Sequence, residues 1–168
     1  MVPKYMHQNR TSANTSINST KVPALFRKIR WIAGTRNLDW GGGKYDTATE
    51  YLKQYGVQNV IYDPFNRSDE ENHAALAGTY DTVTLSNVLN VIAERDIRIE
   101  AVQGALDHLK PGGRLYISVY EGNHSGVGRR TKPDCWQCNR PLTDYAVEIG
   151  EELNLFSVIR RGYITITK

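Results

Sequence analysis

Apolar positions along the chain of 168 residues follow two alternating patterns. In the first, apolar side chains recur three or four residues apart, as in an amphipathic helix, across residues 21–33, 46–55, 68–77, 93–109 and 142–153. The second is a short run of β-branched and aromatic residues, typical of strands, across residues 36–40, 58–63, 81–87 and 114–120. Residues 156–161 and 163–168 meet at Arg161–Gly162 and predict a closing hairpin.

This alternation of strands and helices predicts an α/β fold. We expect a doubly wound, mostly parallel, Rossmann-like sheet with helices on both faces and an antiparallel hairpin at the C-terminal end. The length suits one domain, which we place at residues 23–168. Residues 7–20 are polar and rich in Ser, Thr and Asn, so we expect residues 1–22 to form either a loose arm or an arm that orders over a ligand.

Composition narrows the class of protein only slightly. The sequence has 40% hydrophobic and 23% charged residues, ordinary values for a soluble globular protein. It contains no apolar run long enough to span a membrane and no signal-peptide pattern, so a cytoplasmic protein is expected. The net charge of +3 permits a nucleic-acid partner without indicating one.

Two cysteines, Cys135 and Cys138, form the pair in "CWQC". They are too few for a disulfide framework, and a structural zinc ion needs four ligands. A redox pair is expected at the end of a strand in a βαβ unit, whereas this pair lies in an irregular stretch after residue 120. We therefore interpret both as free thiols and expect no metal site.

The stretch "NLDWGGGKYD" places three glycines between a predicted strand and a predicted helix. At this position of a doubly wound sheet, glycines let the main chain approach a ligand closely, and the first strand ends in Asp39. Asp63 ends the second strand, where a carboxylate accepts hydrogen bonds from both hydroxyls of a ribose. A plain tight turn explains the glycines alone, but strand, glycines, helix and acid together favour a nucleoside ligand.

Four segments resemble class I S-adenosylmethionine-dependent methyltransferases, most closely the small stand-alone enzymes of phages and bacteria: "NLDWGGGKYD", "VIYDPFN", "YDTVTLSNVLNVI" and "LKPGGRLYISVY". The last segment discriminates best, because nicotinamide dehydrogenases share the glycine loop and the ribose acid but have no comparable element there. The resemblance covers roughly residues 36–120 and implies S-adenosylmethionine as the cofactor.

The resemblance also implies roles for individual residues. Asp39 and the main chain of Gly41, Gly42 and Gly43 would face the methionine part of the cofactor. Asp63 would bind the ribose, and Pro64 and Phe65 would flank the adenine. Ser86 and Asn87 would line the floor where the methyl group meets its acceptor.

Three positions depart from the family pattern. Tyr45 stands where a third glycine is usual, so the cofactor's approach must differ there. Residues 64–80 are too few for the usual helix, strand and second helix, so we expect the third, edge strand of the family's sheet to be shortened or absent. The acid that contacts the adenine amine in many relatives has no clear counterpart, and Asp69 is the nearest candidate.

The methyl group of a sulfonium is already electrophilic, so alignment of donor and acceptor is the main task of the protein. A base is needed only if the acceptor must lose a proton, and the candidates beside Asn87 are Tyr120, Glu121 and His124. Three alternatives remain open: a non-catalytic S-adenosylmethionine-binding module, a hydrolase or lyase that degrades this molecule, and, least favoured, a nicotinamide oxidoreductase.

The acceptor is not specified by the sequence. The stretch after residue 120 should overhang the cleft, and Trp136 there lies among basic residues, namely Arg129, Arg130, Lys132 and Arg140. An aromatic ring beside cations suits an anionic or nucleobase-containing acceptor, including nucleic acid. A solvated loop with one buried tryptophan explains the same residues. A small molecule, nucleotide, nucleic acid or peptide is therefore expected as acceptor.

Overall fold

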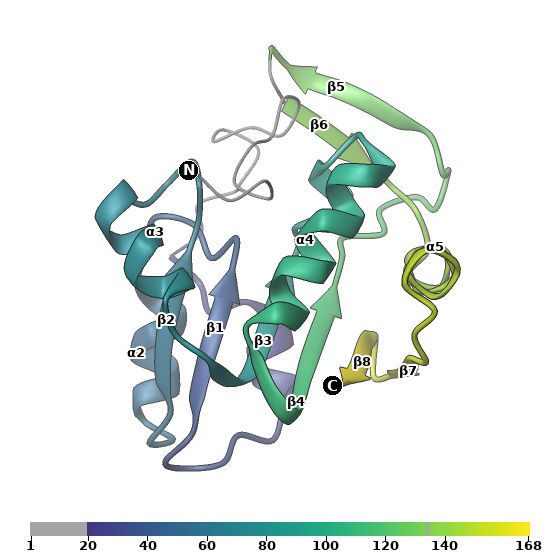
Figure 1. Cartoon of the computed structure of the whole chain (residues 1–168). Coiled ribbons are helices and arrows are strands. Elements are labelled where there is room, and N and C mark those ends of the chain that lie inside the picture. Colours follow the sequence, from purple (N-terminus) through teal and green to yellow (C-terminus); the bar gives the residue numbers. More distant parts are fainter. Residues whose placement is uncertain (1–19, 134) are drawn as a thin grey trace.

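The computed structural model, which describes residues 20–133 and 135–168, contains a central sheet of six strands in the order β2-β1-β3-β4-β8-β7 (Figure 1). The parallel strands are β1 (Arg36–Trp40), β2 (Gln58–Tyr62), β3 (Tyr80–Ser86) and β4 (Leu109–Ser118). The antiparallel strands are β8 (Tyr163–Thr167), which pairs with β4, and β7 (Val158–Arg160). The predicted α/β fold with its C-terminal hairpin is confirmed.

The strand order reverses beside β1. The chain passes from β1 to β2 on one side and then to β3 on the other, so that Asp39 pairs with both Ile61 and Thr84. Such a switch point opens a crevice at the carboxyl ends of the strands. The predicted loss of one edge strand is also confirmed, because β2 lies at the sheet edge and only α3 (Asp69–Leu76) fills the connection to β3.

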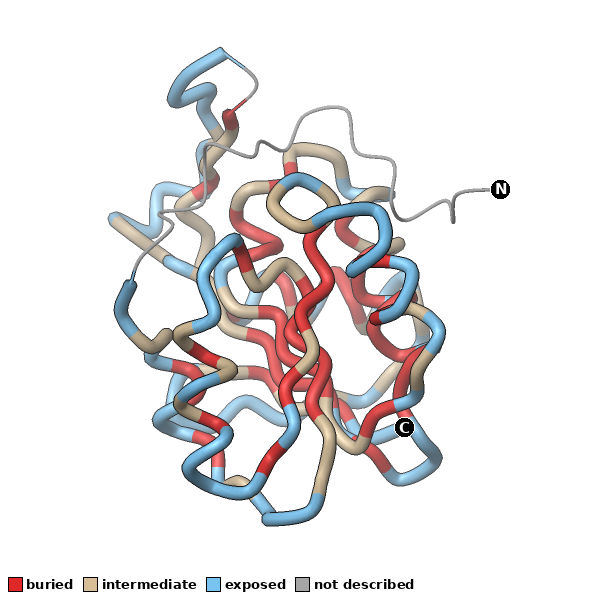
Figure 2. Tube along the Cα trace, turned by 90° about the vertical axis from the view of Figure 1, so that its left-hand side faces the viewer, coloured by how far each residue is buried: buried red, intermediate tan, exposed pale blue. Residues whose placement is uncertain are grey.

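Helices cover both faces of the sheet. α1 (Ala24–Lys28) and α2 (Thr47–Lys53) pack on one face, and α3, α4 (Arg95–Asp107) and α5 (Leu142–Leu153) pack on the other. Alternation along β1 explains this division, because Leu38 and Trp40 belong to the larger apolar cluster while Asn37 and Asp39 point to the opposite face. Figure 2 shows the buried residues concentrated in the central strands.

Two predicted elements have different limits. The helix predicted over residues 21–33 ends at Lys28, because the indole N–H of Trp31 donates to the carbonyl of Phe26 (2.8 Å) and the two rings stack. The strand predicted from residue 114 begins at Leu109. Gly113 permits this irregular start, since a Cβ there would lie 2.9 Å from the carbonyl oxygen of Asp81 on the neighbouring strand.

The stretch after β4, predicted to be irregular, forms a two-stranded hairpin of β5 (Gly128–Lys132) and β6 (Cys135–Cys138). Trp136 packs over Gly128, where a Cβ would overlap the indole ring. β6 also contacts a short 3₁₀ helix, η2 (Leu89–Val91), that follows β3. The hairpin therefore lies at the carboxyl ends of the parallel strands (Figure 1).

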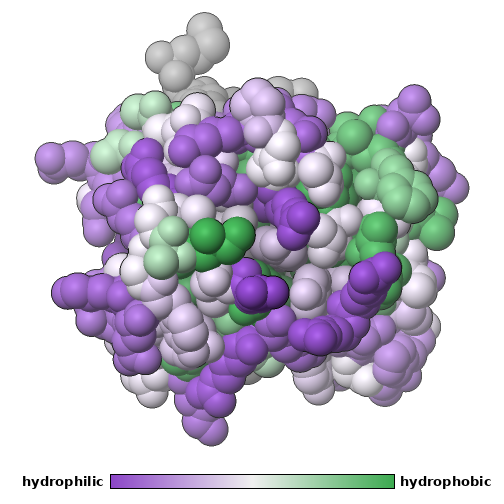
Figure 3. Space-filling model, turned by 90° about the horizontal axis from the view of Figure 1, so that it is seen from below, coloured by the Kyte–Doolittle hydropathy of each residue, from purple (hydrophilic) through white to green (hydrophobic). Residues whose placement is uncertain are grey.

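The opposite end of the molecule is mainly hydrophilic, with apolar side chains in scattered groups (Figure 3). Among the described residues, no helix has the length and apolar character needed to cross a bilayer. Most of the predicted N-terminal arm, residues 1–19, lies outside the described residues. That arm and the domain limits at residues 23–168 stay predictions.

Candidate functional site

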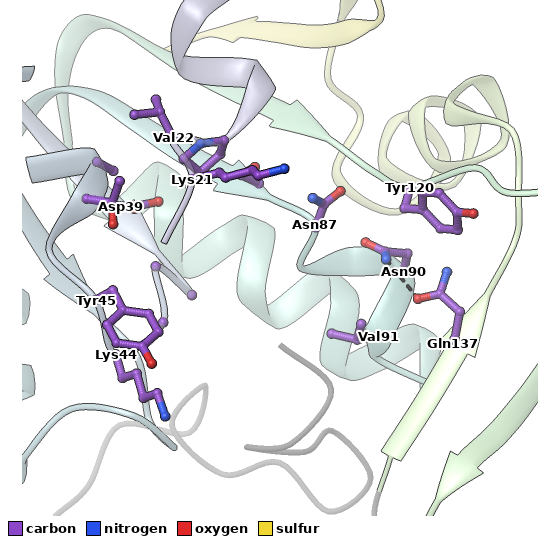
Figure 4. A pocket seen from close by; sticks show the side chains of 17 residues that line it. Lys21, Val22, Asp39, Lys44, Tyr45, Asn87, Asn90, Val91, Tyr120 and Gln137 are labelled. Carbon is purple, nitrogen blue, oxygen red and sulfur yellow. Dashed lines mark hydrogen bonds between the residues drawn. The ribbon is translucent and has the colours of Figure 1, made fainter. Parts of the chain in front are cut away.

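A cavity of about 410 Å³ opens at the carboxyl ends of β1, β3 and β4 (Figure 4). Its lining comes from the segment before α1, the glycine loop after β1, the ends of β3 and β4, η2 and β6. The lining residues are Lys21, Val22, Pro23, Asp39, Gly41, Gly42, Gly43, Lys44, Tyr45, Thr47, Ala48, Ser86, Asn87, Asn90, Val91, Tyr120 and Gln137. The cavity therefore lies at the switch point of the sheet, where ligands of doubly wound folds bind.

The glycine loop presents its bare main chain to this cavity. Gly41 and Gly43 have positive φ angles of 79° and 76°, which glycine adopts without steric cost. A Cβ at Gly42 would lie 2.6 Å from the carboxylate of Asp39, and one at Gly41 would lie 2.6 Å from a methyl group of Val88. The close fit of the loop to Asp39 and Val88 therefore requires glycine at both positions.

Asp39 lies beneath the loop and is 2% exposed. Burial raises the pKa of its carboxyl to about 7. The nearby negative charge of Asp63 raises this pKa further, whereas the hydroxyl of Thr84, which donates to Oδ1 (3.1 Å), and the positive charge of Arg67 lower it. Asp39 thus changes charge near neutral pH, directly below the cavity.

A buried polar network supports Asp39 from the sheet. Asn37 Nδ2 donates to Asn59 Oδ1 (2.9 Å) and to Thr84 Oγ1 (3.1 Å), and Thr82 Oγ1 donates to Asn37 Oδ1 (2.7 Å). These bonds join β2, β1 and β3 on the face that carries Asp39. A connected buried network of this kind fixes side-chain orientation, so the carboxylate has a rigid foundation.

Asp63 is held within the protein. Its Oδ2 accepts from the backbone N–H of Gly43 (2.9 Å), and its Oδ1 accepts from the backbone N–H groups of Phe65 and Asn66 (3.0 Å each) and from Asn66 Nδ2 (3.1 Å). Asp63, Pro64 and Phe65 do not line the cavity. The carboxylate predicted to contact ribose therefore ties the glycine loop to the end of β2.

Arg67 holds the same loop from the other side. Its Nε donates to the carbonyl of Gly43 (2.8 Å), and its Nη1 pairs with Asp46 (2.9 Å). Both peptide groups of Gly43 are thus engaged, one by Asp63 and one by Arg67. Sequence reasoning missed Arg67, whose partner Gly43 lies 24 residues away along the chain.

Ser86 and Asn87, at the end of β3, line the cavity, and their predicted role as its floor stays a prediction. Asn87 adopts a φ angle of 57°, a left-handed conformation that asparagine tolerates better than most residues. Its backbone N–H donates to the carbonyl of Ser118 (2.9 Å), which fixes it against β4. Tyr45 also lines the cavity and is 40% exposed.

The predicted bases separate into two groups. Tyr120 lines the cavity and is 62% exposed. Glu121 and His124 do not line it, because the Glu121 carboxylate accepts from the backbone N–H of Leu142 at the start of α5 (2.9 Å) and lies 3.7 Å from His124 Nδ1. Asp69 lies in the first turn of α3, also outside the lining.

The basic residues near the cavity are likewise divided. Arg129, Arg130 and Lys132 are exposed along β5. Arg140 instead lies over the Tyr145 ring, 4.4 Å from its centroid, and pairs with the buried Glu148 at 3.4 Å. Arg140 therefore belongs to the packing of α5, because its charge is directed inward.

Cys135 and Cys138 are buried in β6 and form no disulfide between the described residues. Burial raises the pKa of the Cys138 thiol, whose Sγ donates to the carbonyl of Gly126 at 3.6 Å. Within residues 20–133 and 135–168, no group of three or more His, Cys, Asp and Glu side chains is arranged to hold a metal ion.

A family model described as a methyltransferase domain matches residues 10–156. The chain belongs to this methyltransferase family. The match includes the glycine loop, the floor at Asn87 and the β5–β6 hairpin, so the cavity of the methyltransferase lies wholly inside it. No curated protein gives a significant match to the sequence of this methyltransferase.

Solved structures share the fold of the methyltransferase. The 1,6-didemethyltoxoflavin N1-methyltransferase of Burkholderia thailandensis, with that compound and S-adenosylhomocysteine bound, is 18% identical with a TM-score of 0.58 over 80% of this chain and 70% of that one. An amino pentose methyltransferase from Micromonospora echinaspora, with bound S-adenosylmethionine, is 15% identical with a TM-score of 0.52 over 81% of this chain and 83% of that one. An O-methyltransferase family 2 protein from Planctomyces limnophilus, in complex with apigenin, is 18% identical with a TM-score of 0.54 over 87% of this chain and 56% of that one.

Proposed function

We propose that this methyltransferase transfers the methyl group of S-adenosylmethionine to an acceptor bound beside Asn87. The observation that carries the proposal is the bare main chain of Gly41–Gly43, which faces a cavity at the switch point of the sheet. Structural neighbours with S-adenosylmethionine or S-adenosylhomocysteine bound support the choice of cofactor.

The residues of the cavity fit this cofactor. The glycine loop lines the cavity with its bare main chain, which would hold the amino-acid tail, and the loop fits closely against Val88 and Asp39 only with glycine at Gly41 and Gly42. Asp39 below the loop supplies a carboxylate toward the ammonium group of that tail. Asp63 lies outside this lining and holds the glycine loop through the N–H of Gly43, so its contact with the ribose stays a prediction.

When bound, S-adenosylmethionine supplies an electrophilic methyl group. The chain's own residues hold the donor and the acceptor in line, an effect that contributes up to about 7–11 kcal/mol in favourable systems. Asn87, fixed to β4 through its backbone N–H, forms the floor at which the two would meet. Tyr120 lies at the exposed end of the same cavity.

The acceptor enters, in this proposal, beneath the β5–β6 hairpin. Arg129, Arg130 and Lys132 on β5 and Trp136 on β6 would contact an anionic or nucleobase-containing acceptor. Arg140 does not belong to this hairpin surface, because its guanidinium pairs with Glu148. A small-molecule or nucleotide acceptor needs only the cavity itself.

Incubation with S-adenosylmethionine labelled in its methyl group tests the function. The expected result is label transferred to an added or co-purifying acceptor, together with release of S-adenosylhomocysteine. Binding without transfer to any acceptor would identify a non-catalytic binding module. Label in a breakdown product of the cofactor, in the absence of an acceptor, would identify a hydrolase or lyase.

A further inference from the structure

A chain of side-chain amides runs from the loop after β4 to the cavity. Asn123 Oδ1 accepts from the backbone N–H of Ser125 (3.2 Å) and from Asn139 Nδ2 (3.1 Å). Asn139 Oδ1 accepts from Gln137 Nε2 (3.1 Å), and Gln137 Oε1 accepts from Asn90 Nδ2 (3.1 Å). The chain ends at Asn90, whose bond to Gln137 is drawn in Figure 4.

Two backbone groups fix the direction of every bond in this chain. The N–H of Ser125 only donates, so the oxygen of Asn123 must face it. The carbonyl of Cys138 only accepts, and it receives Gln137 Nε2 at 3.2 Å. Gln137 must therefore present its oxygen to Asn90, which leaves the oxygen of Asn90 on the side of its amide turned away from Gln137.

This oxygen has no hydrogen-bond partner among the described residues. Asn90 is 2% exposed and lines the cavity, so water has little access to its side chain from outside. A buried acceptor without a partner is costly and is rare in folded proteins. The chain of amide hydrogen bonds orients the Asn90 oxygen toward a ligand cavity. A hydrogen-bond donor on the ligand is the simplest partner for this oxygen.

The segment that carries Asn90 is itself held rigidly. Arg98 on α4 donates from Nη1 to the carbonyls of Ile92 (3.0 Å) and Ala93 (2.9 Å), directly after η2. The same guanidinium pairs with the buried carboxylate of Glu148 on α5. The main chain just after Asn90 is therefore fixed, while the Asn90 side chain is oriented by its bond to Gln137.

We infer that Asn90 Oδ1 receives an N–H of the methyl acceptor, and that this acceptor is a neutral nitrogen compound. The inference rests on the proposed methyl transfer and names the class of its acceptor. Asn90 is then a residue that binds the acceptor and determines specificity, three positions beyond the floor residue Asn87.

Nitrogen is favoured over oxygen because the described residues place no general base beside Asn90. Among the described lining residues the only carboxylate is Asp39, which lies beneath Gly42. The other ionisable lining side chains are lysines and tyrosines, and the described lining contains no histidine. A hydroxyl would need deprotonation before attack, whereas a neutral amine already has a reactive lone pair.

The transfer then balances without a catalytic base. The nitrogen lone pair forms the N–C bond while the S–C bond of the sulfonium breaks, and the bonding pair remains on sulfur. The product nitrogen carries the positive charge and releases a proton to water. Asn90 orients the N–H throughout and takes no proton, since an amide oxygen is too weak a base.

The test uses the full chain and a defined panel of probes: adenosine, cytidine, aniline and glucosamine. Each is paired with a counterpart that carries two N-methyl groups or a hydroxyl in place of the amine. We expect labelled methyl on at least one amine and on no counterpart. Calorimetry on protein saturated with S-adenosylhomocysteine should show heat of binding for that amine only.

Variants at Asn90 and Gln137 complete the test. We expect Asn90→Ala to lower kcat/KM for the amine at least tenfold and to abolish its binding heat, with S-adenosylhomocysteine affinity unchanged within twofold. Asn90→Asp keeps an acceptor oxygen and should retain more activity than Asn90→Ala. Gln137→Leu frees the Asn90 amide to rotate and should raise KM more than it lowers kcat.

Several outcomes overturn the inference: transfer to a hydroxyl counterpart, transfer to no panel member although the cofactor binds, or unchanged kcat/KM and binding heat in Asn90→Ala. If wild-type protein binds neither S-adenosylmethionine nor S-adenosylhomocysteine, the proposed function itself fails. The two failures are distinguished because cofactor binding is measured separately from the acceptor.

Discussion

Asp39 is a buried acid whose charged form would favour ligand binding but lowers the stability of the folded protein. It lies under Gly42 with its carboxylate almost fully buried, and its pKa rises to about 7 from an ordinary value of 3.8. A neutral acid is the stable form of such a group below that pH, while the ammonium group of a cofactor bound as proposed would favour the charged form. We therefore expect cofactor affinity and protein stability to respond to pH in opposite directions.

The stability response has a definite sign. Because the folded-state pKa of Asp39 lies above its unfolded value, the folded protein holds the proton between about pH 4 and pH 7. The stabilisation of the folded state by this bound proton is complete below pH 4. It falls as the pH rises through 7, and it is absent at pH 8. Its size is on the order of a few kcal/mol.

Asp39→Asn removes this titration while keeping the shape of the side chain. We expect the variant to unfold at higher urea concentration than wild type at pH 8, with a smaller difference at pH 5. The variant should also bind S-adenosylhomocysteine more weakly at pH 8, since the carboxylate is lost. Equal wild-type-to-variant differences at pH 5 and pH 8 would contradict the raised pKa.

Residues of the site differ in how far the sequence predicts them. The glycines, Asp39 and Asn87 follow from local pattern, because a strand end, a tight turn and a helix start are encoded within a few residues. The positions of Asp63 and Asn90 depend on Gly43 and Gln137, which lie 20 and 47 residues away. No local pattern reveals such partners. The hydrogen bonds that engage the Asp63 carboxylate and orient the Asn90 amide could therefore be found only from the structure.

At the scale of elements, the glycine loop depends on the turn after β2. Arg67 reaches back from this turn to the carbonyl of Gly43, and Asp63 takes the N–H of the same residue. The loop is therefore held in one conformation before a ligand arrives. Such preorganisation reduces the entropy that binding must otherwise overcome.

Arg67→Ala should release this loop. We expect the free energy of unfolding to fall by about 1–3 kcal/mol, since the carbonyl of Gly43 loses its partner, and S-adenosylhomocysteine affinity to fall about tenfold. Urea unfolding and calorimetry measure the two effects. A variant with unchanged affinity would show that the loop is rigid without Arg67.

Arg95→Ala is the matched control. Arg95 also pairs with two carboxylates, Glu151 and Glu152, but it is 48% exposed and lies away from the cavity. Exposed pairs of this kind contribute about 0–1 kcal/mol. We expect cofactor affinity to stay at the wild-type value in this variant.

The hairpin after β4 was the element least accessible to sequence reasoning. Its residues show no regular alternation, and its two strands are held by contacts of Trp136 with Gly128 and of Gln137 with Asn90. The long strands and helices, by contrast, repeat their pattern over enough residues to be recognised. The order of the strands and helices was therefore predicted more accurately than the β5–β6 hairpin beside the cavity.

At the scale of the whole molecule, ligand binding should couple to stability. A ligand that binds only the folded state at 100 times its Kd adds about 2.7 kcal/mol. For a domain of this size each kcal/mol raises Tm by roughly 2–4 °C. We expect S-adenosylhomocysteine at that concentration to raise Tm by roughly 5–10 °C in a thermal scan.

Adenosine alone is the comparison ligand for this measurement. It lacks the amino-acid tail that the glycine loop would hold, so its shift at equal concentration should be much smaller. Equal shifts for both ligands would place the main binding energy outside the Gly41–Gly43 loop.

The sheet ends at β2, with Phe65 40% exposed just beyond it. If the purine of the cofactor lies beside Phe65, as the proposed binding mode has it, no further strand among the described residues covers that side. A bulky group attached to the purine would then extend past the edge of the sheet. We therefore expect this methyltransferase to accept donor molecules enlarged at that ring, which would allow its acceptor to be captured by chemical tagging.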